Sequence, residues 1–133
     1  MPLTYHIDTA RGLVQTTASG VLTDHDVLDL KARLASDPGW SPGMRELADI
    51  SGIDALEVTA DGVRQMVQED ASTPDLGAYR LAIVAPANDV FGMARMYQML
   101  TDRVVPNIGV FRSVNEALAW IESPETFRAP SRS

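Results

Sequence analysis

The stretch RLAIVAP, residues 80–86, is the most apolar run in the chain and decides the fold class. From Leu81 to Ala85 the residues are apolar, they do not alternate with polar ones, and two of them are β-branched. A short run of this kind is typical of a strand in a parallel sheet, which is buried on both faces. We therefore predict a central parallel strand at residues 80–86.

Strand and helix patterns alternate on both sides of this run. Two runs, residues 3–8 and 13–18, flank a glycine-containing loop and predict a β-hairpin that ends at Ser19-Gly20. Two further strands are predicted at residues 44–50 and 107–111. Four helices are predicted, each after residues suited to cap its start: after Thr23, Thr59, Asn88-Asp89 and Ser113.

The element order is thus β-β-α-β-α-β-α-β-α, which predicts an α/β fold. Strands that alternate with helices imply crossover connections and a mostly parallel five-stranded sheet, in which the hairpin makes the first strand antiparallel. We predict one domain over residues 1–123 and a mobile tail over residues 124–133, which are rich in Pro, Ser and Arg.

Composition excludes several classes of function. The net charge is −7 and Lys31 is the only lysine, so neither nucleic acid nor an anionic membrane surface is expected as a partner. No apolar run is long enough to span a bilayer, and the N-terminus lacks the basic and apolar regions of a signal peptide, so we expect a cytoplasmic protein. Without cysteine there is no disulfide, thiolate ligand or cysteine nucleophile.

No motif of a known catalytic or cofactor site is present. His6 and His25 fall on different predicted elements, and their acidic neighbours do not have the spacing of metal ligands. The chain contains no nucleophile elbow, phosphate-binding loop or dinucleotide-binding glycine motif. We therefore predict a protein that is not an enzyme and uses no metal or other cofactor.

The stretch DISGI, residues 49–53, follows a predicted strand and resembles the Asp-Leu-Ser-Gly-Val of STAS domains, which have the SpoIIAA-like fold. The stretch TADGV, residues 59–63, is similar to the Asp-Ser-Ser-Gly-Leu that starts the next helix of those domains. Three further stretches resemble a small stand-alone bacterial branch described as STAS/SEC14-related and mostly of unknown function: residues 42–49, 92–97 and 110–121.

The resemblance implies a SpoIIAA-like fold and regulation through protein contact. In anti-sigma factor antagonists the regulatory phosphate goes on the serine immediately before the helix-start glycine, and Asp61 stands at that position here. Thr59 and Ser51 are the hydroxyls nearest to it in sequence. We therefore expect the usual phosphoacceptor to be missing, with Thr59 as an ordinary helix cap and Asp61 as a first-turn acid. DISGI itself is expected to end its strand and turn the chain.

Polar residues at predicted strand ends form a candidate pocket. Asp49, Asn88 and Arg112 follow three parallel strands, and ligands of open parallel sheets bind beyond such carboxyl ends. Asn88 and Arg112 favour an anion there, whereas Asp89 would repel one. Routine helix capping is the alternative.

The third predicted helix carries apolar residues on two sides. Its core face is expected to hold the following: Val90, Met93, Met96, Tyr97 and Leu100. Phe91 and Met99 fall on the other side, near Arg95, and need a different cover. We take Phe91, Met99, Met96 and Arg95 as a candidate interface or ligand site, with local packing as the alternative.

Two hypotheses about function follow. The first is a non-enzymatic regulatory module that binds a protein partner or a second copy of itself, as a homodimer. The alternative, suggested by the SEC14 relationship, is a binder of a small apolar or lipid-like molecule between the third helix and the sheet.

Overall fold

The computed structural model describes residues 2–123. The tail predicted to be mobile, residues 124–133, lies outside the described residues. Within them the elements follow the predicted order, with one short 3₁₀ helix added. They are β1 (Leu3–Asp8), β2 (Leu13–Thr23), α1 (Asp24–Ser36), β3 (Arg45–Glu57), α2 (Ala60–Ala71), η1 (Leu76–Ala78), β4 (Arg80–Val84), α3 (Asn88–Leu100), β5 (Asn107–Phe111) and α4 (Val114–Ile121).

The sheet has the spatial order β1-β2-β3-β4-β5, so each strand lies next to its neighbours in sequence. β1 pairs with β2 antiparallel, and the other three pairings are parallel. The predicted α/β fold, the mostly parallel five-stranded sheet and the antiparallel first strand are therefore confirmed. The run that predicted a central strand is β4, in which Leu81 to Val84 are all buried.

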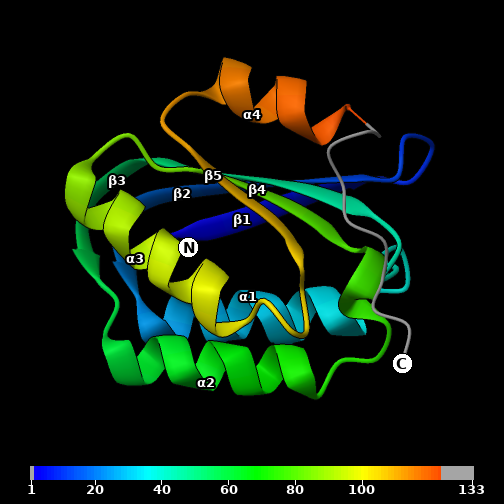
Figure 1. The fold of residues 1–133 in the computed structure, drawn as a ribbon, viewed down its shortest axis with the longest axis horizontal. Coiled ribbons are helices and arrows are strands. Elements are labelled where there is room, and N and C mark those ends of the chain that lie inside the picture. The colour runs from blue at the N-terminus through cyan, green and yellow to red at the C-terminus, as the bar shows by residue number, and fades with distance from the viewer. Residues whose placement is uncertain (1, 124–133) are drawn as a thin grey trace.

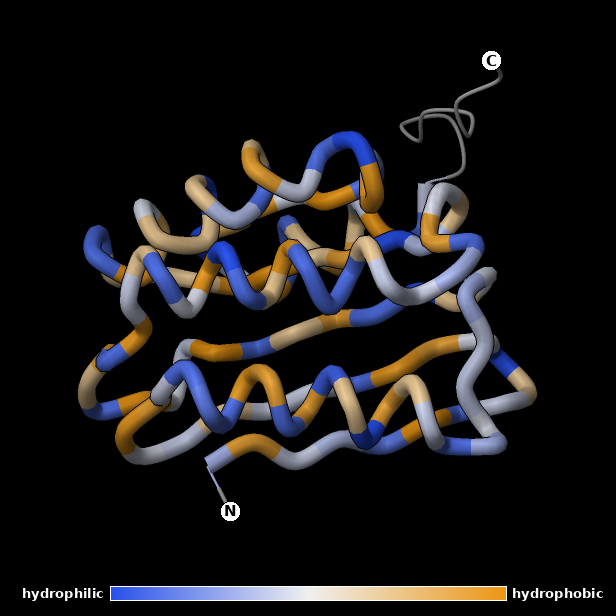
Figure 2. Tube along the Cα trace, turned by 90° about the horizontal axis from the view of Figure 1, so that it is seen from below, coloured by the Kyte–Doolittle hydropathy of each residue, from blue (hydrophilic) through white to orange (hydrophobic). Residues whose placement is uncertain are grey.

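Helices cover the sheet unequally. Figure 1 shows α1, α2 and α3 on one side of the sheet and α4 alone on the other. The α4 side has a small core of its own, which contains Leu47, Val84, Ala117 and Ile121. Hydrophobic and hydrophilic residues recur once in each turn of the helices (Figure 2), as expected for helices with one buried face.

Helix starts agree with the predicted caps at three of four places. Thr23, Thr59 and Ser113 each accept a hydrogen bond from a backbone N–H of the first turn. The prediction that Asn88-Asp89 cap the third helix is wrong, because α3 begins at Asn88, two residues before the predicted start at Val90, and its N-cap Ala87 provides no side-chain hydrogen bond.

The predicted ends of two strands are wrong. Ser19-Gly20 does not end β2 and DISGI does not end β3, since the two strands continue side by side to Thr23 and Glu57. Two register shifts lie in this extension, and at each of them β3 has one more residue than β2. Gly20 has φ +68°, a conformation that other residues rarely adopt, so the glycine makes an irregular strand pairing rather than a turn.

Candidate functional site

A cavity lies between the sheet and the three helices α1, α2 and α3. Its volume is about 140 Å³, and its lining is almost entirely aliphatic. All three helices and strands β1 to β4 contribute residues, among them Leu30, Ala48, Val63, Met66, Ile83, Met93 and Ala94. Four polar residues also reach its wall: Thr16, Lys31, Glu46 and Tyr97.

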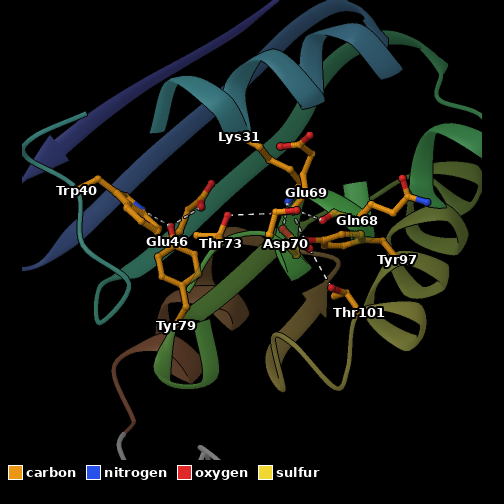
Figure 3. A network of polar contacts seen from close by, with 11 residues as sticks. Lys31, Trp40, Glu46, Gln68, Glu69, Asp70, Thr73, Tyr79, Tyr97 and Thr101 are labelled. Atoms are coloured by element: carbon orange, nitrogen blue, oxygen red, sulfur yellow. Dashed lines mark hydrogen bonds and ion pairs between the residues drawn. The ribbon is translucent and has the colours of Figure 1, made fainter. Parts of the chain in front are cut away.

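Lys31 ties the three helices together at one end of this cavity. Its Nζ lies 2.8 Å from Asp70 Oδ1 of α2 and 2.8 Å from the hydroxyl of Tyr97 in α3. Asp70 also accepts hydrogen bonds from Tyr97 and from Thr101, which ends α3. Figure 3 shows these side chains converging from separate helices.

Charge is balanced within this group. Burial by itself lowers the pKa of Lys31, but Tyr97 and Asp70 raise it overall, so the lysine stays charged. Burial raises the pKa of Tyr97 and outweighs the opposing effect of Lys31, so the phenol stays neutral. The ammonium and the Asp70 carboxylate thus form an internal ion pair with hydrogen bonds from two hydroxyls.

A second polar group centres on the buried carboxylate of Glu46. Its oxygens accept hydrogen bonds from Thr16 at 2.8 Å and from the hydroxyl of Tyr79 at 2.6 Å. Trp40 donates from its indole nitrogen to the same Tyr79 oxygen, at 3.2 Å. Burial and the neighbouring Glu46 raise the pKa of Tyr79 well above its usual value. Like Asp70, Glu46 is therefore held by donors that remain protonated at neutral pH.

Sequence reasoning missed both groups. In the sequence Lys31 counted only as the single lysine of an acidic chain, although a lone lysine beside the apolar positions Leu30 and Leu34 was a weak signal of a buried role. Asp70, Glu46 and Tyr79 give no local signal, because their partners are 27 to 39 residues away in sequence.

The start of α2 is held by an acid from α1. The Oδ1 of Asp24 accepts a 2.8 Å hydrogen bond from the Thr59 N–H, and its Oδ2 accepts one of 2.6 Å from the Thr59 hydroxyl. Asp61 points away into solvent and forms an exposed ion pair with Arg64 at 2.7 Å. Ser51 lies elsewhere, on β3, where its N–H and hydroxyl both donate to Asp49. The three residues predicted around the switch position therefore do not form one cluster.

The candidate strand-end pocket is only partly assembled. Arg112 donates to Asn88 Oδ1 at 2.7 Å and to the Pro86 carbonyl at 2.9 Å, so these two predicted residues do meet. Asp49 instead accepts from Ser51 on β3. A hollow of about 160 Å³ nearby is lined by β3 residues 50–56, except Gly52, and by Pro86, Ala87, Asp89 and Val90.

The outer residues of α3 have separate environments. The guanidinium of Arg112 lies 4.0 Å from the ring centre of Phe91 and gives that ring a local cover. Met99 is 66% exposed, and Arg95 bonds to Gln98 within the helix. Leu100, expected in the core, is 48% exposed, because the buried face of α3 runs through Val90, Ala94 and Tyr97.

Within residues 2–123 no group of three or more His, Cys, Asp or Glu side chains is placed to hold a metal ion. No helix of this part of the chain is long and apolar enough to cross a membrane.

The strand order, the single antiparallel strand and the three-plus-one division of helices define the SpoIIAA-like fold. No protein-family model matches the chain, and no curated protein does either. Solved structures of this fold do match along most of the chain. An uncharacterised DUF3478-family protein with a SpoIIAA-like fold from Shewanella loihica is 19% identical, with 90% of this chain and 93% of that chain covered and a TM-score of 0.54.

Two matching structures are anti-sigma factor antagonists. The unphosphorylated form of SpoIIAA is 12% identical, with 88% and 94% of the two chains covered and a TM-score of 0.55. An antagonist from Mycobacterium paratuberculosis is 15% identical, with 91% and 95% covered and a TM-score of 0.51. The SpoIIAA-like fold predicted from the sequence is thus confirmed.

Proposed function

We propose that the protein is a non-enzymatic regulatory module that binds a small apolar molecule in the cavity beneath α1, α2 and α3. The observation that carries this proposal is the aliphatic cavity of about 140 Å³ at the centre of the larger core. Native cores are close-packed, and leaving an enclosed volume of this size empty costs about 3 kcal/mol at roughly 24 cal/mol per Å³, which is the upper limit for a cavity that is partly open. An occupant would recover that free energy.

The size of the cavity limits the ligand. An apolar cavity of about 150 Å³ accepts benzene, so this one suits a single ring or a short branched chain rather than a whole lipid. The ligand proposed here is therefore smaller than the lipid-like molecule that the SEC14 relationship suggests.

The charges on the cavity wall favour a neutral ligand. Lys31 is the only cation among the lining residues, and Asp70 already neutralises it. Glu46 brings a negative charge whose oxygens accept from Thr16 and Tyr79. An anionic ligand would meet that carboxylate with no free cation to balance it, and desolvating its charge would be costly.

The regulatory part of the proposal is supported by the two similar structures named as anti-sigma factor antagonists. In this view the chain contacts a protein partner or a second copy in the cytoplasm, and the ligand modulates that contact. Regulation does not use a serine phosphate, because Asp61 occupies the corresponding position and the hydroxyl of Thr59 is engaged by Asp24.

A titration with benzene as the probe tests ligand binding. NMR spectra of the folded protein should show shifts confined to residues around the cavity, such as Ala94, Val63 and Ile83. At ten times the Kd, benzene should raise the free energy of unfolding by about 1.4 kcal/mol. Benzoate, an anion of similar shape, should give no such change.

Two alanine variants provide the matched comparison. Ala94→Leu fills part of the cavity and should abolish the benzene shifts, whereas Ala119→Leu makes the same change on the exposed face of α4 and should retain them. Shifts that persist in Ala94→Leu, or that scatter over the surface of the native chain, would contradict the proposal.

A further inference from the structure

The second part of β3, residues 50–57, has a strand on only one side. β4 pairs with β3 from Arg45 to Asp49 and no further, while β2 follows β3 to Glu57. Among residues 2–123 no strand pairs with the other edge of residues 50–57. Backbone N–H and C=O groups on such an edge are ready to pair with an added strand.

The space beside this edge is open. After β4 the chain turns away at Pro86 and begins α3, so the position of a continuing strand is left as the hollow of about 160 Å³. Figure 1 shows the end of β3 and the start of α3 at the same end of the molecule. Ile53, Leu56 and Val90 give the hollow an apolar floor on which alternate side chains of a strand can pack.

The surroundings of the hollow are acidic. Asp54 and Asp89 line it, and Glu57 follows on the same strand; all three are exposed. Arg112 reaches the rim of the hollow at Pro86, but its guanidinium is already occupied by the Pro86 carbonyl, Asn88 and the ring of Phe91. Carboxylates without a cation nearby favour a positively charged partner.

A second copy of the chain suits this edge poorly. Pairing two such edges would bring Asp54 and Glu57 of one copy close to the same acids of the other, and like charges across strands are destabilising. Asp54 is also the extra residue of a register shift, an irregularity that disfavours flat pairing of two identical edges.

We propose that residues 50–57 of β3 form a docking edge for an extended segment of a partner protein in which Lys or Arg alternates with apolar residues. The segment adds a short strand to β3, places its apolar side chains in the hollow and sets its basic ones against Asp54, Asp89 and Glu57. The hollow shares Ile50, Leu56 and Val90 with the lining of the cavity, but docking uses the backbone edge of β3 and exposed acids that do not line the cavity. Failure of the docking proposal would therefore leave the ligand proposal standing.

A capped synthetic peptide, Lys-Val-Lys-Val-Lys-Val, serves as the probe at about 0.15 M salt. Amide signals of residues 50–57 should shift and their hydrogen exchange should slow, and the Glu-Val counterpart should leave both unchanged. Asp54→Lys should weaken peptide binding by about tenfold. Glu69→Lys, which makes the same charge change at an exposed site near the far end of α2, should leave it within about twofold.

Three outcomes would overturn the proposal. The first is the absence of any amide shift along residues 50–57 when the peptide is added to the native chain and its spectrum is well dispersed. The second is an equal loss of binding in both lysine variants, which would indicate attraction by overall charge alone. The third is a concentration-dependent dimer of the native chain that protects this same edge.

Discussion

The carboxylate of Asp24, at the first position of α1, holds the first turn of α2 through the backbone and the hydroxyl of Thr59, the latter at 2.6 Å. The same carboxylate packs against Gly62, so closely that any Cβ at that position would overlap it. Two helices that begin 36 residues apart are thus joined at their starts by one acid.

Replacing Gly62 tests this junction. Ala normally stabilises a helix relative to Gly by about 1 kcal/mol, so propensity alone predicts that Gly62→Ala is favourable. Because the added methyl group displaces Asp24, we expect Gly62→Ala to lower the free energy of unfolding by about 1–2 kcal/mol. Gly92→Ala in α3 meets no atom within 4 Å and should instead be stabilising. Urea unfolding of both variants measures the difference, and two stabilised variants would contradict the role of Asp24.

The same junction bears on phosphorylation. A phosphate on Thr59 would lie against the Asp24 carboxylate, and the two negative charges would repel. Incubation with a serine kinase of the anti-sigma type should therefore leave Thr59 and Ser51 unmodified, as mass spectrometry of the intact chain would show. Stoichiometric phosphate on either residue would contradict this prediction and would show that the chain can be regulated by phosphorylation.

The ion pair of Lys31 and Asp70 is expected to matter for stability. Their side chains are 21% and 7% exposed, so removing the lysine leaves a largely buried carboxylate without its countercharge. We expect Lys31→Met to lower the free energy of unfolding by about 2–4 kcal/mol. Arg64→Met removes an exposed pair, with side chains 62% and 89% exposed, and should change it by less than about 0.5 kcal/mol. Similar small effects for both variants would show that the buried group is not a stabilising junction.

A pH effect is expected at Asp37. The N–H of Gly39 and the hydroxyl of Tyr5 both donate to its carboxylate and lower its pKa below the ordinary value. A lowered pKa in the folded state contributes stability above the unfolded pKa, and that contribution is lost as the pH falls through the folded pKa. Tyr5→Phe should raise the pKa of Asp37 part of the way back, since the Gly39 bond remains. Carbon-detected NMR titration measures the pKa of the Asp37 carboxyl group in both chains. An unchanged pKa in Tyr5→Phe would show that the Tyr5 hydroxyl does not lower it.

The sequence predicts the parts of this fold that depend on local chemistry. The caps Thr23, Thr59 and Ser113 act on backbone groups three residues away, so their pattern is visible in the chain itself. The apolar run at β4 is equally direct, because a strand buried on both faces leaves no polar positions.

Other features could not be predicted because they depend on distant segments. DISGI was expected to turn the chain, but pairing with β2 keeps it extended despite the glycine and the bond between Ser51 and Asp49. Lys31 finds its partners 39 and 66 residues along the chain, which no local pattern indicates. The cavity exists because side chains from many elements do not fill the space between them. No single stretch of sequence indicates such an unfilled volume.

Crystals exposed to xenon gas test the central claim most directly, because xenon enters dry apolar cavities and scatters X-rays strongly. The proposal predicts one well-occupied xenon site between Ala94, Ile83 and Val63, and its loss in Ala94→Leu. A cavity that contains ordered water and no xenon, or side chains that close the space in the crystal, would contradict a site for a small apolar ligand.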